Sequence, residues 1–344
     1  MEKVRRKAVT MEDVAREAGV SVTTVSHVIN QTASITEETC DRVQQAIQKL
    51  GYVPRTSAEL NRGQRIIGVF TPEISNEFYA RSIQAVFQAV FQAAWEQDYA
   101  VMVCSMEHRH QAETSYIRSL IQSGVKGLIF FGGAMENERQ IINASKRVPV
   151  VLGDRRMPNE PIDCVGTDNT EVMRRMIGKL VRAGYTRIGY VSEDLIMNNC
   201  ADRYMGYRQG LADHGLTVNE RWVYLLAELR LNKAENTYHY FLNLERGQSM
   251  PQIFLCSSDL IALGLMAALK ARGLRIPRDV GVVGFDDISI AAFADPPLTT
   301  IAQDMHQLGR ACFQALLNRM ENRNQTPQEI IVRSKIVQRD SVRL

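Results

Sequence analysis

The chain has 344 residues, which exceeds a typical single domain, so we expect at least two folding units. Hydrophobic residues make up 45% of the chain and aromatic residues 7%, and this composition excludes a disordered polypeptide. The 41 basic and 38 acidic side chains give a formal net charge of only +3, which taken alone argues against a nucleic-acid partner.

The N-terminal segment and the cysteines both indicate a cytoplasmic protein. Residues 1–8 are basic, but Thr10–Val14 follows where a secretory peptide would carry an apolar stretch. No apolar run approaches the ~20 residues that a transmembrane helix needs. The six cysteines are dispersed without a C-x-x-C pair, which predicts reduced thiols and no zinc site. We therefore expect neither a metal nor another cofactor.

The first 50 residues predict three short helices and almost no strand. Thr10 and Asp13 have capping-box spacing, Gly19 suits a left-handed helix end, and Ser21 can cap the next helix. The helices are expected at 10–18, 22–29 and 36–50. Two short helices joined by a Gly-containing turn form a helix-turn-helix, whose second helix fits a DNA major groove. Unrelated proteins also contain such helical pairs, so the periodicity alone leaves a plain helical hairpin open.

After a polar linker at 55–65, short apolar runs alternate with amphipathic helical stretches. Strands are expected at 66–70, 99–104, 127–131, 148–152, 187–191, 222–226, 252–256 and 280–284. Helices are expected at 79–95, 111–123, 136–145, 170–183, 202–214 and 259–272. Continuous apolar strands separated by helices are typical of a parallel sheet covered on both faces. About 280 residues are too many for one compact sheet, so two α/β subdomains are predicted.

Several motifs in the chain resemble the lactose/galactose repressor family of bacterial transcription regulators. They are Thr10–Asn30, Glu37–Pro54, Ile276–Asp287 and Pro296–Ile301. Because they stand in the family's order, the resemblance covers essentially the whole chain. It implies a small all-α helix-turn-helix headpiece and an α/β periplasmic-binding-protein-like core of two parallel-sheet subdomains. The implied boundaries are 1–53 for the headpiece, 54–65 for the hinge and 66–344 for the effector-binding and dimerisation core.

The resemblance implies an effector-controlled, sequence-specific DNA-binding regulator, more often a repressor, of carbohydrate-utilisation genes. A homodimer would bind double-stranded, pseudo-palindromic operator DNA, and a small molecule between the subdomains would alter operator affinity. A sugar or sugar derivative is the expected effector, with a purine as the alternative. An enzyme and an exported solute receptor are the competing classes. Against them, the chain has no G-x-S-x-G, Walker, G-x-G-x-x-G or H-E-x-x-H motif and no export signal.

The resemblance also implies which headpiece side chains contact DNA. Val22, Thr23 and His27 would face base edges, because a methyl contact, a hydroxyl and an imidazole donor each suit a major-groove partner. Many relatives carry Arg at the position of His27. Phosphate-contacting or capping roles are implied for Ser21, Thr24, Ser26 and Asn30.

The hinge departs from the family pattern. Relatives place a leucine seven residues after the proline of the Tyr-x-Pro element, and this leucine wedges into the minor groove. Here that position is Asn61, and Leu60 precedes it. Leu60 is the candidate DNA-contacting wedge, with a plain flexible tether as the alternative.

Effector-contacting residues are expected directly after the core strands, because the carboxyl ends of parallel strands line the cleft. The resemblance maps Asp154, Arg203, Ser258 and Asp286 onto positions that usually hydrogen-bond the effector. Phe78 follows the first strand and could stack on a sugar face. Carboxylate and guanidinium groups suit polyhydroxylated ligands, because each can engage two adjacent hydroxyls.

Three further polar residues near these positions admit more than one role. Asp259 precedes an apolar helix, which favours an N-cap or a contact between subdomains over ligand binding. Arg155 and Arg156, together with Arg203, would suit an acidic ligand, although exposed arginines are common.

Overall fold

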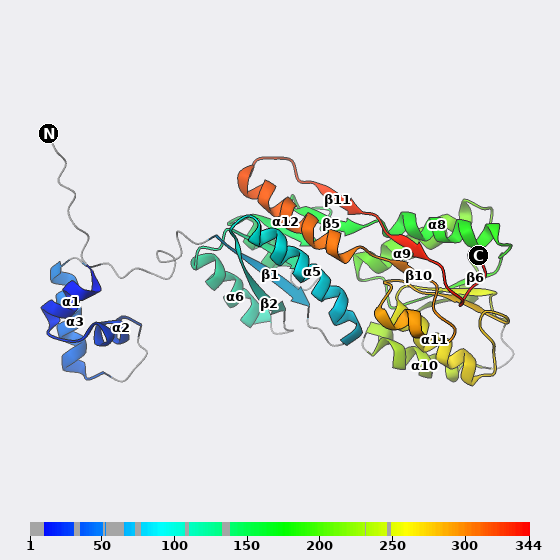
Figure 1. The fold of residues 1–344 in the computed structure, drawn as a ribbon, viewed down its shortest axis with the longest axis horizontal. Coiled ribbons are helices and arrows are strands. Elements are labelled where there is room, and N and C mark those ends of the chain that lie inside the picture. Colours follow the sequence, from blue (N-terminus) through cyan, green and yellow to red (C-terminus); the bar gives the residue numbers. More distant parts are fainter. Residues whose placement is uncertain are drawn as a thin grey trace. The chain divides into compact units, whose positions relative to one another are not determined.

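The computed structural model describes residues 10–30, 35–50, 52, 65–72, 77–106, 110–132, 138–230, 232–245 and 249–344. The chain divides into two compact units, Met1–Gly63 and Gln64–Leu344. Figure 1 shows the helices and strands of each unit, and each unit has a hydrophobic core of its own. No helix in the described ranges is long and apolar enough to cross a membrane.

The first unit is a three-helix headpiece. Its helices are α1 (Met11–Ala18), α2 (Val22–Asn30) and α3 (Glu37–Leu50). Thr10 and Asp13 form the predicted capping box, and Gly19 ends α1 at a φ of 64°, a conformation that glycine adopts without strain. The buried side chains of the three helices pack on one another and on Tyr52. They are Val14, Ala15, Ala18, Val25, Val43 and Ala46.

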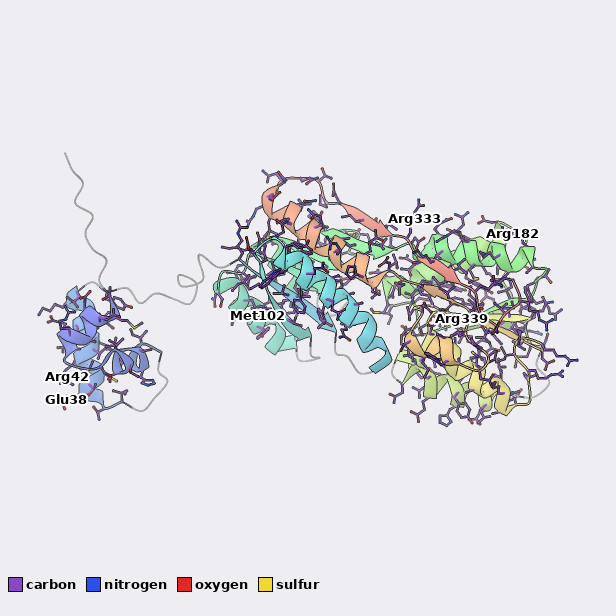
Figure 2. All side chains as sticks on the ribbon, in the orientation of Figure 1. Glu38, Arg42, Met102, Arg182, Arg333 and Arg339 are labelled. Atoms are coloured by element: carbon purple, nitrogen blue, oxygen red, sulfur yellow. The ribbon has the colours of Figure 1, made fainter. Side chains whose placement is uncertain are left out.

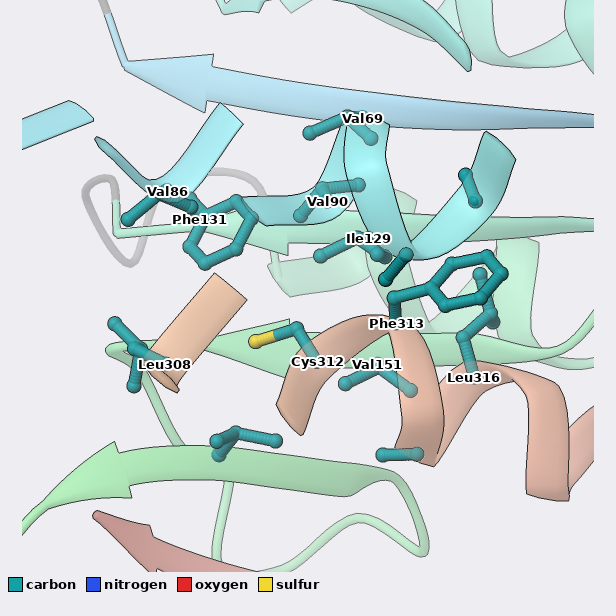
Figure 3. Packing of buried hydrophobic residues seen from close by; sticks show 14 of the residues in the cluster. Val69, Val86, Val90, Ile129, Phe131, Val151, Leu308, Cys312, Phe313 and Leu316 are labelled. Atoms are coloured by element: carbon teal, nitrogen blue, oxygen red, sulfur yellow. The ribbon is translucent and has the colours of Figure 1, made fainter. Parts of the chain in front are cut away.

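The second unit begins with a subdomain built on a six-stranded parallel sheet in the order β11-β5-β4-β3-β1-β2. Its strands are β1 (Ile66–Pro72), β2 (Ala100–Met106), β3 (Gly127–Phe131), β4 (Val150–Gly153), β5 (Asp163–Thr167) and β11 (Glu329–Val332). Its helices are α5 (Glu77–Trp95), α6 (His110–Gln122), α7 (Glu138–Ser145) and α12 (Met305–Glu321). Val90 of α5 and Phe313 of α12 pack on Ile129 at one face of the sheet (Figure 3). On the other face, α6 and α7 contribute Ile117 and Ile141 to a separate cluster.

The other subdomain has a four-stranded parallel sheet in the order β7-β6-β8-β9. Its strands are β6 (Ile188–Ser192), β7 (Val223–Leu225), β8 (Ile253–Cys256) and β9 (Gly281–Val283). Its helices are α8 (Asn169–Arg182), α9 (Asn198–Ala212), α10 (Lys233–Leu242) and α11 (Asp259–Ala271), with short 3-10 turns η3 (Glu220–Trp222), η4 (Ala227–Arg230) and η5 (Ser289–Phe293). Helices α8 and α9 share one core cluster, α10 and α11 another, so both sheet faces are covered.

Three chain crossings join the two subdomains, and they lie side by side. They run through residues 167–169, 302–305 and 332–335, next to the short antiparallel pair β10 (Thr300–Ala302) and β12 (Lys335–Val337). The Thr167 hydroxyl donates to the Gln303 side-chain oxygen over 3.1 Å, which joins the first crossing to the second. The Ser334 N–H donates to Asp168 Oδ1 over 2.7 Å, which joins the third to the first. A shift of one crossing therefore acts on the other two.

The predicted headpiece and two-subdomain α/β core are confirmed. Helix α9 begins at Asn198, four residues earlier than expected, because the segment before Asp202 carries no strong helix-start signal. The sequence pattern did not predict the elements that complete the sheets and cover them. These are β5, α10, β10, α12, β11 and β12.

Candidate DNA-reading helix and effector site

Helix α2 presents its first residues at the headpiece surface. Val22 and Thr23 are exposed, whereas Val25 is fully buried against α1. His27 and Ser26 are half-buried on the same helix. The buried side chain fixes the rotation of α2, so the predicted base-reading residues Val22 and Thr23 are directed away from the headpiece core.

The start of α2 is capped by its own hydroxyl groups. The Thr24 N–H donates to Ser21 Oγ over 3.0 Å, and the two hydroxyl oxygens of these residues lie 2.8 Å apart. This contact satisfies one of the free N–H groups at the helix start. Ser21 and Thr24 therefore have a structural role that is compatible with the predicted phosphate contacts.

Some predicted site residues lie outside the described part of the structure. This applies to Leu60 and the hinge around it, and to the side chains of Asn30 and Phe78. Asn30 is the last residue of α2, and Phe78 lies in the first turn of α5. Their predicted roles stay predictions.

Arg203 is the centre of a polar network in the core. It projects from α9 and is only 4% exposed. Its Nε donates to Asn169 Oδ1 over 2.9 Å, and its Nη1 donates to the Ser257 carbonyl over 2.6 Å. The guanidinium carbon lies 3.6 Å from the centroid of the Phe285 ring, and Nη1 lies 3.7 Å from Asp286 Oδ1. These contacts from separate elements fix the guanidinium plane.

Asp154 and Asp286 follow strands of different subdomains. Asp154 comes directly after β4 at a φ of 51°, and Asp286 follows β9 at a φ of 112°. Residues other than glycine rarely adopt such backbone angles, and the residues that do are often found at binding sites. The Asp286 carboxylate accepts from Gln303 Nε2 over 2.8 Å. Asp154 Oδ1 is buried and has no hydrogen-bond partner among the described residues.

The two carboxylates are perturbed by burial and by Arg203. Burial raises the pKa of Asp154 to about 6, against the opposing effect of Arg203. Burial also raises the pKa of Asp286, and Arg203 again opposes the shift. Although burial disfavours the charged guanidinium, Asp286 and other nearby acidic groups hold the pKa of Arg203 above its ordinary value. Groups perturbed in this way are typical of ligand sites.

Ser258 and Asp259 together organise the start of α11. Ser258 is the N-cap, since the Ile261 N–H donates to its Oγ over 3.4 Å. The fully buried Asp259 carboxylate accepts from the Ile288 N–H over 2.8 Å and from the Thr300 hydroxyl over 2.5 Å. The expectation that Asp259 is an N-cap is therefore wrong, whereas the structural role favoured for it over ligand binding agrees with these contacts. The extended backbone of Ser258 takes the cap, and Asp259 holds the segment that presents Asp286.

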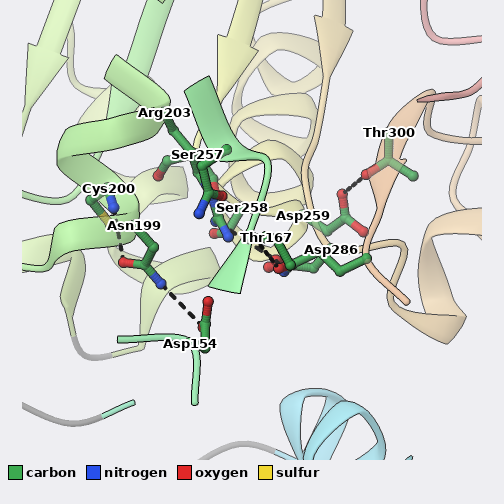
Figure 4. A network of polar contacts seen from close by, with 12 residues as sticks. Asp154, Thr167, Asn199, Cys200, Arg203, Ser257, Ser258, Asp259, Asp286 and Thr300 are labelled. Atoms are coloured by element: carbon green, nitrogen blue, oxygen red, sulfur yellow. Dashed lines mark hydrogen bonds and ion pairs between the residues drawn. The ribbon is translucent and has the colours of Figure 1, made fainter. Parts of the chain in front are cut away.

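Direct contacts also join the subdomains beside Asp154. Arg156 forms an ion pair with Asp202 of α9, and its N–H donates to Asn198 Oδ1 over 3.3 Å. Asn199 Nδ2 donates to Asp154 Oδ2 over 3.4 Å (Figure 4). We name these five residues the latch. They connect the end of β4 in one subdomain with the first turns of α9 in the other.

Arg155 and Arg156 do not form an anion-binding site together with Arg203. Arg155 Nη2 lies 3.9 Å from Glu138 Oε1, and its Nη1 donates to the Gly132 carbonyl over 3.5 Å. Arg156 is paired with Asp202. Both guanidinium groups therefore have partners within the protein.

Two hollows border the polar network. One, of about 440 Å³, is lined in part by Asp286, Gln303 and Lys335 beside the chain crossings. A narrow one, of about 30 Å³, is lined in part by Asp154 and Asn199. In the described ranges, no group of three or more His, Cys, Asp or Glu side chains could hold a metal ion. The polar side chains that line these two hollows suit hydrogen bonding to a small organic molecule.

Sequence reasoning missed Asn169, Asn199 and Gln303. Asn169 and Asn199 lie in first turns of α8 and α9, and Gln303 directly follows β10. The rule that polar groups after a strand line the cleft applies to Gln303. This rule could not identify Gln303 from the sequence, because β10 has only three residues and was not predicted.

The headpiece is a separate unit with an exposed second helix, and the polar network around Arg203 lies between two α/β subdomains. Together these features are typical of a DNA-binding protein that is controlled by a small molecule. Residues 10–55 match the bacterial regulatory proteins of the lacI family, and residues 177–342 match the periplasmic binding protein-like domain. The repressor PurR of Vibrio cholerae serotype O1 is 32% identical over 338 residues, covering 97% of this chain and 98% of the relative. This chain therefore belongs to the lacI family and is an effector-controlled, DNA-binding transcription regulator.

Solved structures agree over nearly the whole chain. The Lac repressor dimer bound to operator and the anti-inducer ONPF is similar with a TM-score of 0.71 and 25% identity, covering 97% of this chain and 99% of that one. The complex of the transcriptional regulator CelR with cellobiose is similar with a TM-score of 0.69 and 26% identity, at the same coverage. The fold and family expected from the sequence are confirmed.

Proposed function

We propose that this chain is a homodimeric repressor that reads a pseudo-palindromic operator with α2 of each copy. The exposure of Val22 and Thr23 above the buried Val25 supports base reading by this helix. The similarity to PurR and to the operator-bound Lac repressor dimer supports repression and two-fold binding. The site of action is the cytoplasm, where bacterial operators are found, and the chain catalyses no reaction.

The proposed effector is an uncharged sugar or sugar derivative held by Asp154, Arg203 and Asp286. One observation carries this proposal: the fixed Arg203 guanidinium lies 3.7 Å from Asp286 of its own subdomain, and Asp154 Oδ1 of the other subdomain is buried without a partner among the described residues. A ligand hydroxyl can donate to that oxygen. The internal pairing of Arg155 and Arg156 removes the support for an acidic ligand.

A purine is the second candidate, because PurR is similar over nearly its whole length. Ring nitrogens and exocyclic groups could also engage the carboxylates and the guanidinium. The cellobiose complex of CelR, at a comparable structural likeness, supports the sugar instead.

In the proposed mechanism, the effector acts on DNA binding through the chain crossings. Gln303 donates to Asp286 and accepts from Thr167, so it joins the ligand-facing carboxylate to two crossings. A ligand that draws Asp286 toward itself changes this contact and with it the relative position of the subdomains. It regulates only if it binds the two arrangements with different affinity.

A thermal-shift screen of sugars, sugar acids, polyols and purines tests the effector class. Gel shifts with the DNA flanking the gene then test operator binding with and without the best hit. We expect a hit among uncharged sugars and a salt-dependent, sequence-specific shift that the hit changes. A purine as the only hit would replace the sugar proposal. No specific shift under any condition would refute the regulator.

A further inference from the structure

A second shielded ion pair lies beside the proposed effector site, between Glu193 and Lys233 of the second subdomain. Lys233 Nζ lies 2.5 Å from Glu193 Oε1, and the two side chains are 26% and 10% exposed. Arg182 of α8, in contrast, is an ordinary exposed charge of the same subdomain (Figure 2). Removing two charges from water is costly, so a shielded pair is weak evidence for a role in stability alone. We name it the α10 pair, because Lys233 is the first residue of α10.

The strand ends place Glu193 at the edge of the sheet where effector-contacting residues are expected. Glu193 directly follows β6, and Ser257 directly follows the neighbouring β8. Asp286 follows β9, which pairs with β8 on its other side. The carboxyl ends of neighbouring parallel strands lie at one edge of a sheet, and ligands bind there. Glu193 therefore extends the row of polar groups that ends in Asp286.

Helix α9 sets the spacing between the α10 pair and Arg203. The Cys200 thiol donates to Glu193 Oε1 over 3.4 Å, and Arg203 Nη1 lies 3.7 Å from Asp286 Oδ1. Cys200 and Arg203 are three residues apart on α9 and therefore lie on one side of the helix. The α10 pair and the pair of Arg203 with Asp286 are consequently one helical turn apart, a rise of about 5 Å along α9.

Two further observations indicate that the α10 pair faces the same site. Burial raises the pKa of Asp286 and Arg203 opposes that shift, and in addition Lys233 lowers the pKa and Glu193 raises it. Charges perturb a carboxylate in this way when they are close to it. Asn232, which precedes Lys233, has a φ of 45°, and strained backbone of this kind is often found at binding sites. The α10 pair therefore belongs to the surroundings of Asp286.

We propose that Glu193 and Lys233 are specificity-determining residues that bind hydroxyl groups of the effector. This inference rests on the proposed function, since it assigns further contacts to the same uncharged sugar. An ammonium group has three donors and a carboxylate has a second oxygen, so both members of the pair can bind a ligand without separating. Two adjacent hydroxyls can then accept from Lys233 and donate to Glu193.

The pairing also explains a preference for an uncharged ligand. A ligand carboxylate would meet Glu193 as well as Lys233, and a ligand ammonium would meet Lys233 as well as Glu193. Either charge therefore gains little, while its loss of hydration is costly. Specificity is a difference between two affinities, so removal of one member of the pair should change which ligand is preferred. The charge that is left should select a ligand of the opposite sign.

The test compares neutral, acidic and amino forms of the same sugars on the full-length protein. The probes are glucose, galactose, mannose and cellobiose, the sugar acids derived from each, and the 2-amino forms of the three hexoses. Thermal shift identifies the binders and isothermal titration measures their affinities. We expect the wild type to prefer a neutral sugar. Glu193→Gln should shift the affinity ratio about tenfold or more toward the sugar acid, and Lys233→Met by a similar factor toward the amino sugar.

Exposed ion-pair residues of the same subdomain provide matched controls. Glu235→Gln removes an acidic charge from the outside of α10, and Lys270→Met removes a basic charge from α11 that is paired with Asp295. Neither control should change the order of affinities. Glu193→Asp and Lys233→Arg keep the charges of the α10 pair, so both should retain the wild-type preference.

Circular dichroism and the melting temperature verify that each variant is folded. If a single variant does not fold, the double variant Glu193→Gln, Lys233→Met leaves no unpaired charge. It should bind the neutral sugar about tenfold more weakly than the wild type, because hydrogen bonds to charged groups are lost. A double variant that binds this sugar like the wild type would overturn the proposal. Folded single variants with the wild-type order of affinities would overturn it as well, and so would a wild type that prefers a charged sugar.

The two proposals fail in different ways. A neutral sugar that binds the wild type and both single variants with the same order of affinities refutes the role of the α10 pair and leaves the proposed function standing. A wild type that binds a purine and no sugar refutes the sugar effector together with this role, and a sequence-specific gel shift would still support the regulator. A sugar preference that depends on the α10 pair, without any sequence-specific gel shift, refutes the regulator and leaves these ligand contacts standing.

Discussion

At the scale of single residues, base reading by Val22, Thr23 and His27 of α2 is a prediction, and His27 offers the clearest test of it. His27→Ala should lower operator affinity by about 1–3 kcal/mol, because the proposed major-groove hydrogen bond would be lost. Binding to non-specific DNA should change little, since phosphate contacts provide it. Fluorescence anisotropy on both DNAs measures this. Gln44→Ala, at an exposed position of α3, is the control. Equal losses on both DNAs would assign His27 a general role.

Asp154 links stability to pH. Burial raises its pKa in the folded protein to about 6, above that of an unfolded Asp. Its ionisation therefore destabilises the fold as pH rises from about 4 to 6, and the cost stays constant above that range. Asp154→Asn should raise the free energy of unfolding by about 1–3 kcal/mol at pH 7.5 and by less at pH 4.5, as urea unfolding would show.

Asp279 is the control of opposite sign for this experiment. The side-chain hydrogen bond from Arg275 holds the pKa of Asp279 down at about 2. Its ionised form therefore stabilises the fold above pH 4, and Asp279→Asn should lower stability at pH 7.5. The same sign for both variants would contradict the assigned environments.

Arg203 should tolerate no replacement, including lysine. A lysine ammonium cannot reproduce the planar contacts to Asn169, Ser257 and Phe285, and it would leave Asp286 buried with a poorer partner. Arg203→Lys is expected to cost about 3–5 kcal/mol of unfolding free energy and to abolish the thermal shift by the effector hit. Arg208→Lys, on the exposed side of α9, should affect neither measurement. A retained shift would show that Arg203 lies outside the effector site.

Among the candidate site residues, Asp286 lies in the Ile276–Asp287 motif and Asp154 directly follows a predicted strand, so the sequence could point to both, whereas Arg203 was indicated by the family resemblance alone. The sequence could not show that Asp154 has an unpartnered oxygen, or that Asn199 faces it from the other subdomain. Both facts depend on the approach of β4 and α9, and the contacting residues Asp154 and Asn199 are 45 positions apart in the sequence.

At the scale of elements, the latch joins β4 to α9 and should therefore stabilise the observed arrangement of the two subdomains. Its ion pair joins Arg156 and Asp202, and Asp202 is largely shielded from solvent. Either Arg156→Asp or Asp202→Arg should weaken binding of the effector hit about fivefold, as expected for loss of one partly exposed pair. Isothermal titration measures the affinity.

The charge exchange tests the latch directly. The double variant Arg156→Asp, Asp202→Arg should restore most of the affinity, because the pair is re-formed with the charges reversed. Rescue should be strongest at low salt. Single variants that bind the hit like the wild type would exclude the latch from effector binding.

Elements with simple patterns were predictable and the others were not. The continuous apolar run of β3 and the amphipathic α8 were found within a residue or so. Strand β5 alternates buried and half-buried residues and contains Gly166, so it lacks a continuous apolar run. Its stability comes from pairing with β4 and β11, and β11 is more than 160 residues away in the sequence. Such long-range pairing is outside the reach of local periodicity.

At the scale of the whole molecule, the two compact units should be separable. A fragment of residues 65–344 contains both core subdomains and the proposed effector site. It should melt at the same temperature as the core transition of the full chain and keep the effector shift, but lose operator binding. Differential scanning calorimetry and gel shifts measure this. A core that unfolds without the headpiece would contradict the separation.

The small net charge argued against a nucleic-acid partner, and that interpretation was wrong for this chain. Residues 1–65 carry ten basic and eight acidic side chains, and the remaining 279 residues carry 31 and 30. The core is nearly neutral and much larger than the headpiece, so the total net charge of the chain does not reveal the basic N-terminal segment. Operator affinity then depends on paired groove contacts as well as on phosphate attraction.

The three chain crossings have a consequence for synthesis on the ribosome. The first subdomain begins at β1 but is completed by α12 and β11, which follow the whole of the second subdomain. Leu308, Cys312 and Phe313 of α12 fill the centre of its core. A nascent chain therefore exposes that unfinished sheet until α12 and β11 emerge. The headpiece, complete within the first 52 residues, can fold long before. Chains truncated before α12 would thus retain a folded headpiece, but the core of their first subdomain would stay incomplete.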